Sequence, residues 1–182
     1  LTAVATLLAP IMTPFLMKTL AGSFVPIDFL AMMTSIFKIV IVPVLLGLIF
    51  NYFFHGKAKW LDKAMPIISM AGIGFIIMII TAAGRDDLLS IGLLLILAAI
   101  IHNLLGYVFG YWGCRIFGMS EQDCRTIAFE VGMQNGGLAT GIALEMGKIS
   151  TVGLAPAIFG PWMNISGSSL ATWWRDKEPK KK

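Results

Sequence analysis

The stretch Phe129-Glu130-Val131-Gly132-Met133-Gln134-Asn135-Gly136-Gly137 places a carboxylate and two amides inside an otherwise apolar segment, Thr126 to Leu144. An acidic group at the centre of a membrane helix costs roughly 2.5–3.5 kcal/mol on insertion scales, so such groups persist where they face a polar cavity and bind a ligand. In a helix, Gln134 would share a face with Glu130. The stretch therefore predicts a binding site inside a membrane-spanning segment.

The glycines of the same stretch predict a break in the helix. Gly132, Gly136 and Gly137 weaken a helix because glycine loses the most conformational freedom on folding. A break frees backbone carbonyls on its N-terminal side, and these with Glu130 form an oxygen cage suited to sodium. It also exposes N–H groups at the start of the second half-helix, which with the helix dipole favour an anion. We weigh this above the alternative, a polar cluster that only holds helices together.

The rest of the chain has the composition of a membrane protein. Apolar residues make up 57%, charged residues 13%, and the mean hydropathy is +0.83. A soluble domain carries about 25% charged residues, so this chain is too poor in charge to cover its own surface, and we expect a lipid bilayer as its solvent. The net charge of +4 lies in connectors and the tail, so we expect no nucleic-acid partner.

Six stretches are long and apolar enough to be membrane helices, which need about 20 residues each. Only helices fit, because strand-type alternation is missing from them. These stretches are residues 1–17, 27–54, 64–84, 88–114, 126–144 and 149–174. We expect the first of them to lack its beginning. Gly106 and Gly110 predict a helix-packing face. We expect the chain to be the C-terminal part of a longer transport protein.

The Lys and Arg positions predict the orientation, because alternate connectors lie on opposite sides of the membrane. One side holds three of these residues: Lys18, Arg85 and Lys148. The other holds ten: Lys57, Lys59, Lys63, Arg115, Arg125, Arg175, Lys177, Lys180, Lys181 and Lys182. We therefore expect a multi-pass protein of the cell inner membrane with a cytoplasmic C-terminus and a basic tail, residues 175–182.

Other polar residues inside spans receive a structural interpretation from the residues alone. Thr2 and Thr6 would share a helix face, but threonines in membrane helices usually bond to their own backbone. For His102 and Asn103, a helix–helix hydrogen bond is favoured over a proton relay. Lys38 either extends outward to the membrane surface or lines a vestibule for anions.

The two cysteines, Cys114 and Cys124, are interpreted as free structural thiols. With only two His in the chain, widely spread, they form no metal-ligand pattern. An enzyme is not expected, since no nucleophile stands beside a base and no His-based metal motif is present in the sequence.

At Glu130-Val-Gly-Met-Gln-Asn135 the chain resembles the bile acid:sodium symporter family, and the resemblance runs nearly end to end. Leu7-Leu8-Ala9-Pro10, followed by Thr13-Pro14, is similar to the end of the family's fifth helix. His102-Asn103-Leu-Leu-Gly106-Tyr107 is similar to its eighth, and Asn164-Ile-Ser-Gly-Ser-Ser-Leu-Ala-Thr172 to its tenth.

The resemblance implies an all-α membrane protein, a polytopic helical bundle. The chain would be the second five-helix inverted repeat of a ten-helix transporter, with a broken helix at the crossing. Residues 1–25 would be the end of helix five in a core domain, and 26–87 panel-type helices six and seven. Residues 88–174 would be core helices eight to ten, followed by the cytoplasmic tail 175–182.

The resemblance also implies two sodium ions. Glu130 matches the acidic residue that is shared by both sodium sites. Thr2 matches a hydroxyl ligand of the first site. Gln134 matches a side-chain ligand of the second site, to which Val131 and Met133 would contribute backbone carbonyls. Ligands from helices three and four are outside this sequence, so the chain as given would form neither complete site without a missing N-terminal half.

For the substrate, Asn135 matches a residue at the family's cavity beside the crossing, and we expect Gly136 and Gly137 to lie at the same place. Gly136 stands where a serine often follows the asparagine in relatives. The sequence itself does not identify the substrate, which in the family is a bile acid or a small carboxylate.

The function that follows is a sodium-coupled symporter that imports an organic anion by alternating access, with sodium as the coupling ion and no cofactor. A proton-coupled carrier of the same fold is one alternative, because a membrane carboxylate can carry a proton. Gln134 and Thr2 favour sodium, since a proton site needs no cage of neutral oxygens. A non-transporting fragment is the other alternative.

Overall fold

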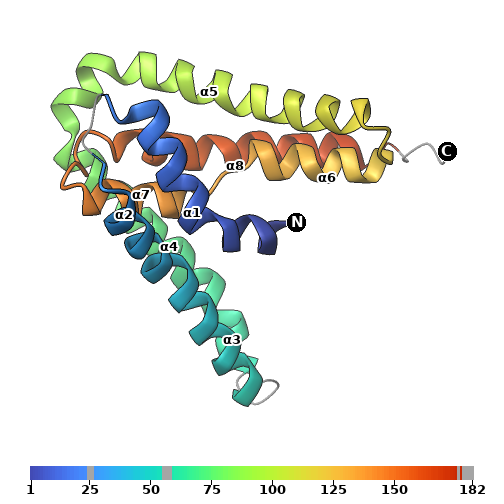
Figure 1. The fold of residues 1–182 in the computed structure, drawn as a ribbon, viewed down its shortest axis with the longest axis horizontal. Helices are drawn as coiled ribbons and strands as arrows, with labels where there is room; N and C mark the ends of the chain where they lie inside the picture. Colours follow the sequence, from blue (N-terminus) through green and yellow to red (C-terminus); the bar gives the residue numbers. More distant parts are fainter. Residues whose placement is uncertain (24–26, 55–58, 176, 178–182) are drawn as a thin grey trace.

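The computed structural model describes residues 1–182 except 24–26, 55–58, 176 and 178–182 (Figure 1). The described part is helical and contains no strand, which confirms the predicted all-α class. Its elements are α1 (Thr2–Ala21), α2 (Phe29–Ile36), the π-helical turn η1 (Phe37–Ile41), α3 (Val42–Phe54), α4 (Lys59–Ala83), α5 (Arg85–Ile116), α6 (Glu121–Gly132), α7 (Gly136–Glu145) and α8 (Leu154–Arg175).

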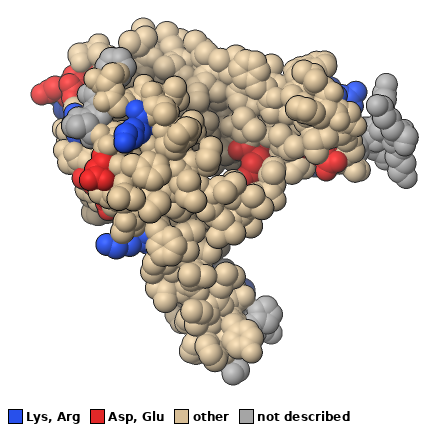
Figure 2. Space-filling view, viewed as in Figure 1, with Lys and Arg blue, Asp and Glu red and all other residues tan. Residues whose placement is uncertain are grey.

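The outer surface of the fold is apolar. Large side chains such as Leu93 and Phe109 are 74% and 66% exposed, which is the pattern of a protein that faces lipid. In Figure 2, which shows one face of the molecule, charged side chains are sparse. In the described part, four segments have the length and composition of membrane-spanning helices: Thr2–Ala21, Phe29–Phe54, Lys63–Ala83 and Arg85–Ile116. They confirm the first four predicted spans.

The last two predicted spans differ from these four. The segment predicted at 126–144 is divided between α6 and α7, of 12 and 10 residues, and each is too short to cross about 30 Å of hydrocarbon alone. The helix α8 has 22 residues but carries polar groups such as Asn164 and Ser166. The Ser166 hydroxyl donates a hydrogen bond to Asn103 of α5, so this polar group has a partner within the bundle.

The helices α5, α6 and α8 pack on one another and form an elongated layer (Figure 1). Gly106 and Gly110 of α5 let the backbone of α6 approach closely. A Cβ at Gly106 would stand 2.9 Å from Gly132 Cα, and one at Gly110 would stand 2.8 Å from the Ile127 carbonyl oxygen. The predicted packing face is therefore confirmed, and α6 is its partner.

The N-terminal helices join this layer through α7, which α2 and η1 contact, and through α4, which packs on α8 and α5. The helix α1 packs on α2 and η1, while α3 and α4 extend away from the layer (Figure 1). The π register of η1 has a local cause. Pro43 has no N–H to donate to the Ile39 carbonyl, four residues earlier. Just before it, the Val42 N–H bonds to the Phe37 carbonyl, five residues earlier, which is the π pattern.

The two cysteines agree with their interpretation, since Cys114 and Cys124 are both buried and form no disulfide. The division into a core (1–25 and 88–174) and a panel (26–87) stays a prediction. Much of the predicted basic tail, including Lys180, Lys181 and Lys182, lies outside the described residues, as does Lys57.

Candidate cation site at the break between α6 and α7

The predicted helix break is present. The helix α6 ends at Gly132, Met133 has an extended backbone with φ −92° and ψ 103°, and α7 begins at Gly136. Gly132 has no space for a side chain, because a Cβ there would overlap the ring of Tyr107. The glycine is therefore required by the close approach of α5.

Asn135 starts the second half-helix. Its Oδ1 accepts a hydrogen bond of 2.9 Å from the Leu138 N–H, and its carbonyl accepts one of 3.2 Å from the Ala139 N–H. These are N-cap contacts, which satisfy donors of the first turn. Asn135, predicted to meet substrate, thus has a capping role that the sequence interpretation missed, although an Asn directly before a helix is a known signal for it.

Thr2 and Glu130 meet at the end of α6. Thr2 Oγ1 donates a hydrogen bond of 2.6 Å to Glu130 Oε2, and the two residues are 128 positions apart. Reasoning from the residues alone assigned Thr2 to its own backbone, and that is wrong; only the family resemblance placed it beside Glu130. For Thr6 the same expectation is confirmed, because its hydroxyl bonds to the Thr2 carbonyl at 2.9 Å.

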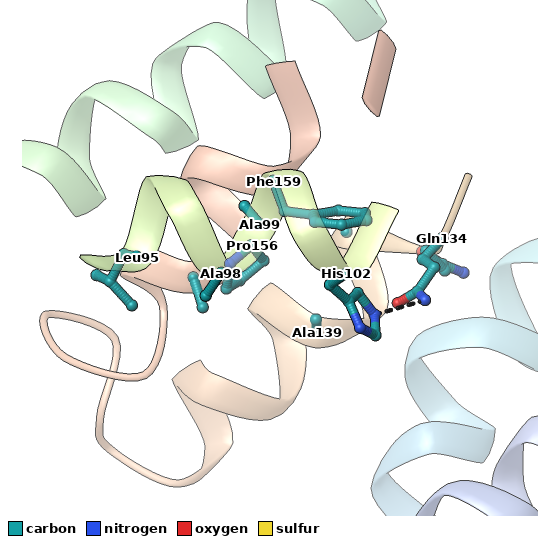
Figure 3. Close-up of a pocket in the computed structure, with 11 residues that line it drawn as sticks. Leu95, Ala98, Ala99, His102, Gln134, Ala139, Pro156 and Phe159 are labelled. Carbon is teal, nitrogen blue, oxygen red and sulfur yellow. Dashed lines mark hydrogen bonds between the residues drawn. The ribbon is translucent and has the colours of Figure 1, made fainter. Parts of the chain in front are cut away.

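Gln134 points to α5 instead of sharing a helix face with Glu130, because the break separates the two residues. Its Nε2 lies 2.8 Å from His102 Nε2 (Figure 3). The adjacent Asn103 is fully buried, and its Nδ2 donates to the Gly132 carbonyl at 2.9 Å. The predicted helix–helix hydrogen bonds of His102 and Asn103 are confirmed, and both end at the break.

Ser166 and Tyr107 complete the contacts of Asn103. Ser166 Oγ donates to Asn103 Oδ1 at 2.6 Å, and Tyr107 Oη lies 3.1 Å from Ser166 Oγ. The Gly132 carbonyl, which the break frees from helical hydrogen bonding, thus already accepts a hydrogen bond from Asn103. The Val131 carbonyl faces α5 across Gly106, where a Cβ would come within 2.9 Å of its oxygen.

A cavity of about 300 Å³ lies between α5, α7 and α8 beside the break (Figure 3). Its lining is mostly apolar, with Leu95 at one end and the His102–Gln134 pair at the other. The full lining is Leu95, Ala98, Ala99, His102, Gln134, Asn135, Gly136, Ala139, Ala155, Pro156 and Phe159. Of the residues predicted to contact substrate, Asn135 and Gly136 border this cavity, and Gly137 follows in the first turn of α7.

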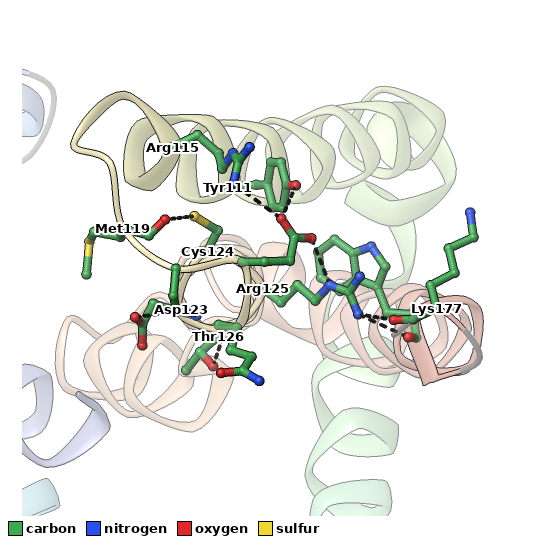
Figure 4. A network of polar contacts seen from close by, with 12 residues as sticks. Tyr111, Arg115, Met119, Asp123, Cys124, Arg125, Thr126 and Lys177 are labelled. Carbon is green, nitrogen blue, oxygen red and sulfur yellow. Dashed lines mark hydrogen bonds and ion pairs between the residues drawn. The ribbon is translucent and has the colours of Figure 1, made fainter. Parts of the chain in front are cut away.

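The other end of α6 is anchored by charge (Figure 4). Glu121 accepts hydrogen bonds from the Tyr111 hydroxyl at 2.8 Å and from Arg125 Nε at 3.0 Å, and Arg115 lies 3.6 Å away. Arg125 Nη1 also donates to the carbonyls of Trp174 and Lys177. These contacts tie α5, α6 and α8 together. Sequence reasoning used these cations only for orientation, although the i, i+4 spacing of Glu121 and Arg125 signals an ion pair.

The same contacts perturb the titration of Glu121. The Tyr111 hydroxyl, followed by Arg125 and Arg115, holds the pKa of this carboxyl below its ordinary value, against the opposing effect of burial. The ionised form of Glu121 is therefore the one that the fold stabilises.

At the break, the donor atoms are one carboxylate, one hydroxyl, one amide and backbone carbonyls. This all-oxygen set suits a hard cation, whereas transition metals favour imidazole or thiolate ligands. In the described residues, no group of three or more His, Cys, Asp and Glu side chains is placed to hold a metal ion.

The first half of the chain matches a known family. The sequence profile of the Sodium Bile acid symporter family matches residues 1–91. The chain belongs to that family. This is a family of transporters and not of enzymes. Membership of the family and the apolar helices described above together indicate a multi-pass membrane protein.

Members of the family with similar sequences extend the match over the whole chain, including the break. YocS of Bacillus subtilis, named a sodium-dependent transporter, is 38% identical over 181 residues, which cover 99% of this chain and 56% of YocS. BASS1 of Arabidopsis thaliana, named a probable chloroplastic sodium/metabolite cotransporter, is 32% identical over 180 residues, or 99% of this chain and 45% of BASS1. The chain spans about half the length of these relatives.

Proposed function

We propose that this chain is part of a sodium-coupled secondary active transporter that imports an organic anion by alternating access. The observation that carries the proposal is the 2.6 Å contact between Thr2 and Glu130 at the end of a broken helix. A carboxylate and a hydroxyl from distant parts of the chain converge there beside backbone carbonyls that the break frees. Such a broken helix is the arrangement that transporters use for sodium.

The cation would be held by charge and by oxygen atoms. Glu130 supplies the negative charge, Thr2 and Gln134 supply neutral side-chain oxygens, and Val131 and Met133 supply carbonyls. Because the relatives are about twice as long as this chain, we propose that an N-terminal half supplies the remaining ligands of both sodium sites. The Thr2 hydroxyl donates a hydrogen bond to the Glu130 carboxylate, so an ion held by both groups would replace that hydrogen bond.

The substrate would be an organic anion, either bile acid-like or a small carboxylate. The cavity beside the break is mostly apolar and has amides and an imidazole at one end, which suits a carboxylate on an apolar body. The first turn of α7, with Gly136 and Gly137, places the positive end of the helix dipole beside this cavity, which favours an anion. Asn135 contributes the side chain nearest to that turn.

For transport, we propose that the panel helices within 26–87 move against the core of residues 1–25 and 88–174. The charge distribution supports a cytoplasmic C-terminus in the cell inner membrane. Arg115, Arg125 and Lys177 gather at one end of α5, α6 and α8 (Figure 4), as expected of the side that retains positive charge.

The test is uptake of labelled organic anions by proteoliposomes that contain the full gene product to which these residues belong. We expect uptake to require sodium when choline replaces it at fixed pH, and we expect Glu130→Gln to abolish it. Asp86→Asn is the matched control, because the Asp86 side chain is 94% exposed at the start of α5. Uptake that persists in choline and follows a pH gradient would instead favour proton coupling.

A further inference from the structure

Two adjacent residues of α5 hold the two sides of the helix break. Asn103 donates to the carbonyl of Gly132, the last residue of α6, at 2.9 Å. His102 contacts the side chain of Gln134, inside the break, at 2.8 Å. Their burial differs: Asn103 is 0% exposed, whereas His102 is exposed and borders the cavity. Asn103 is therefore part of the packed core, and His102 needs a different explanation.

The atoms that face each other fix the orientation of the Gln134 amide. Both are Nε2 nitrogens. An amide nitrogen only donates, so this contact is a hydrogen bond in which the imidazole nitrogen accepts. In this contact the amide nitrogen of Gln134, and not its oxygen, is the atom that meets His102. The ring of His102 is in turn held edge-on to Phe159, with centroids 5.6 Å apart.

This contact has a consequence for a cation. The last torsion of a glutamine side chain is broad and nearly two-fold, so a free amide presents its nitrogen or its oxygen with similar ease. A nitrogen directed at the ion would repel it, and only the oxygen is a ligand. By occupying the nitrogen, His102 selects the orientation in which the oxygen remains for the ion.

We infer that His102 is a positioning residue for the sodium site: it holds the Gln134 amide so that its oxygen, and not its nitrogen, is presented to the cation. This role rests on the proposed function, in which Gln134 is a sodium ligand. Loss of one ordinary hydrogen bond, worth about 0.5–1.5 kcal/mol, predicts a roughly 2- to 10-fold weaker apparent affinity for sodium.

Two substitutions separate positioning from packing. His102→Gln carries an acceptor oxygen at about the distance of the imidazole Nε2, whereas the shorter His102→Asn reaches only as far as Nδ1. Both are polar and of similar character in a membrane helix. We therefore expect His102→Asn to raise the half-saturating sodium concentration about 2- to 10-fold, and His102→Gln to restore it to near the wild-type value.

The measurements use the full gene product in proteoliposomes and in detergent. Uptake is titrated with sodium at saturating substrate and with substrate at saturating sodium, and thermal unfolding is followed with and without sodium. The expected result is a higher half-saturating sodium concentration in His102→Asn and a smaller stabilisation of this variant by the same sodium concentration.

Three results would overturn the inference. If His102→Asn leaves the sodium titration unchanged, the amide needs no positioning. If both substitutions lower the maximal rate and the sodium-free melting temperature without moving the sodium titration, His102 is a packing residue only. If the wild-type protein shows no sodium response in either assay, the proposed function itself fails and this role with it.

Discussion

Thr2 Oγ1 lies 2.6 Å from Glu130 Oε2, so the first turn of α1 supplies the hydrogen-bond donor for a carboxylate at the end of α6. A carboxylate within an apolar bundle is costly unless a partner compensates it. Among the described residues the partner is a neutral hydroxyl and not a basic side chain, so the negative charge remains for a cation. The predictions below follow from this contact and from the way in which α5 supports it.

The Thr2 hydroxyl is expected to matter through its oxygen. Thr2→Val keeps the shape of the side chain but removes the oxygen, and should raise the half-saturating sodium concentration for uptake several-fold, about 3- to 10-fold for one lost ligand. Thr2→Ser should restore it. Thr6→Val is the matched control, because the Thr6 hydroxyl bonds to the backbone of its own helix. An equal effect of Thr2→Val and Thr6→Val would argue against a role of Thr2 as an ion ligand.

The buried Asn103 is expected to hold the end of α6. Asn103→Leu leaves the Gly132 carbonyl and the Ser166 hydroxyl without the partner they have in the native fold. The expected cost is about 1–3 kcal/mol, measured as a loss of stability in detergent. Because Ser166→Ala removes a contact of the same network, the double substitution should cost less than the sum of the two single ones. Strict additivity would show that the network is not coupled.

Gly106 is expected to be intolerant of any side chain. Gly106→Ala places a Cβ 2.9 Å from both Gly132 Cα and the Val131 carbonyl oxygen, so α5 and α6 must separate. We expect a loss of about 1–3 kcal/mol in stability together with weaker sodium dependence of uptake. Gly113→Ala, on the same helix, meets nothing within 4 Å and should be neutral or slightly stabilising. A Gly106→Ala protein as stable as Gly113→Ala would contradict the close packing.

Glu121 is expected to make stability depend on pH. Its pKa is lowered in the folded protein, chiefly by the Tyr111 hydroxyl and then by Arg125 and Arg115. The ionised carboxylate therefore stabilises the fold at pH values above the unfolded pKa of about 4.3, and this contribution is lost as the pH falls through the folded pKa. Glu121→Gln should lower the melting temperature at pH 7 and reduce the loss of stability on acidification.

The control for Glu121 is Asp86→Asn, since the Asp86 side chain is 94% exposed and its ion pair with Arg85 is on the surface. Melting temperatures measured from pH 7 downward should be nearly the same for Asp86→Asn and the wild type. If Glu121→Gln melts like the wild type at pH 7, the cluster at the start of α6 does not anchor that helix.

The sequence predicted the local features of this fold well, because their causes are local. Glycines beside polar residues predicted the break between Gly132 and Gly136, and the spacing of Gly106 and Gly110 predicted a packing face. The hydropathy of the first four spans was also sufficient to find them. The segments that differ are α6 with α7, which the break divides into two short helices, and α8, which carries polar groups such as Ser166.

Contacts between distant segments were not predictable from the residues alone. The pairing of Thr2 with Glu130 requires α1 to pass the end of α6, and no pattern within either helix encodes that. The contact of His102 with Gln134 depends on the break, since an unbroken helix would have turned Gln134 to the face of Glu130. The resemblance to a family supplied the role of Thr2, but nothing in the sequence indicated the role of His102.

The most direct test of the central claim is equilibrium binding of radioactive sodium to the purified full gene product, compared between the wild type and Glu130→Gln. The account predicts saturable binding in the wild type and its loss in Glu130→Gln, with Asp86→Asn binding as the wild type does. Saturable binding that is equally strong in Glu130→Gln would contradict the claim that this carboxylate at a broken helix holds the cation.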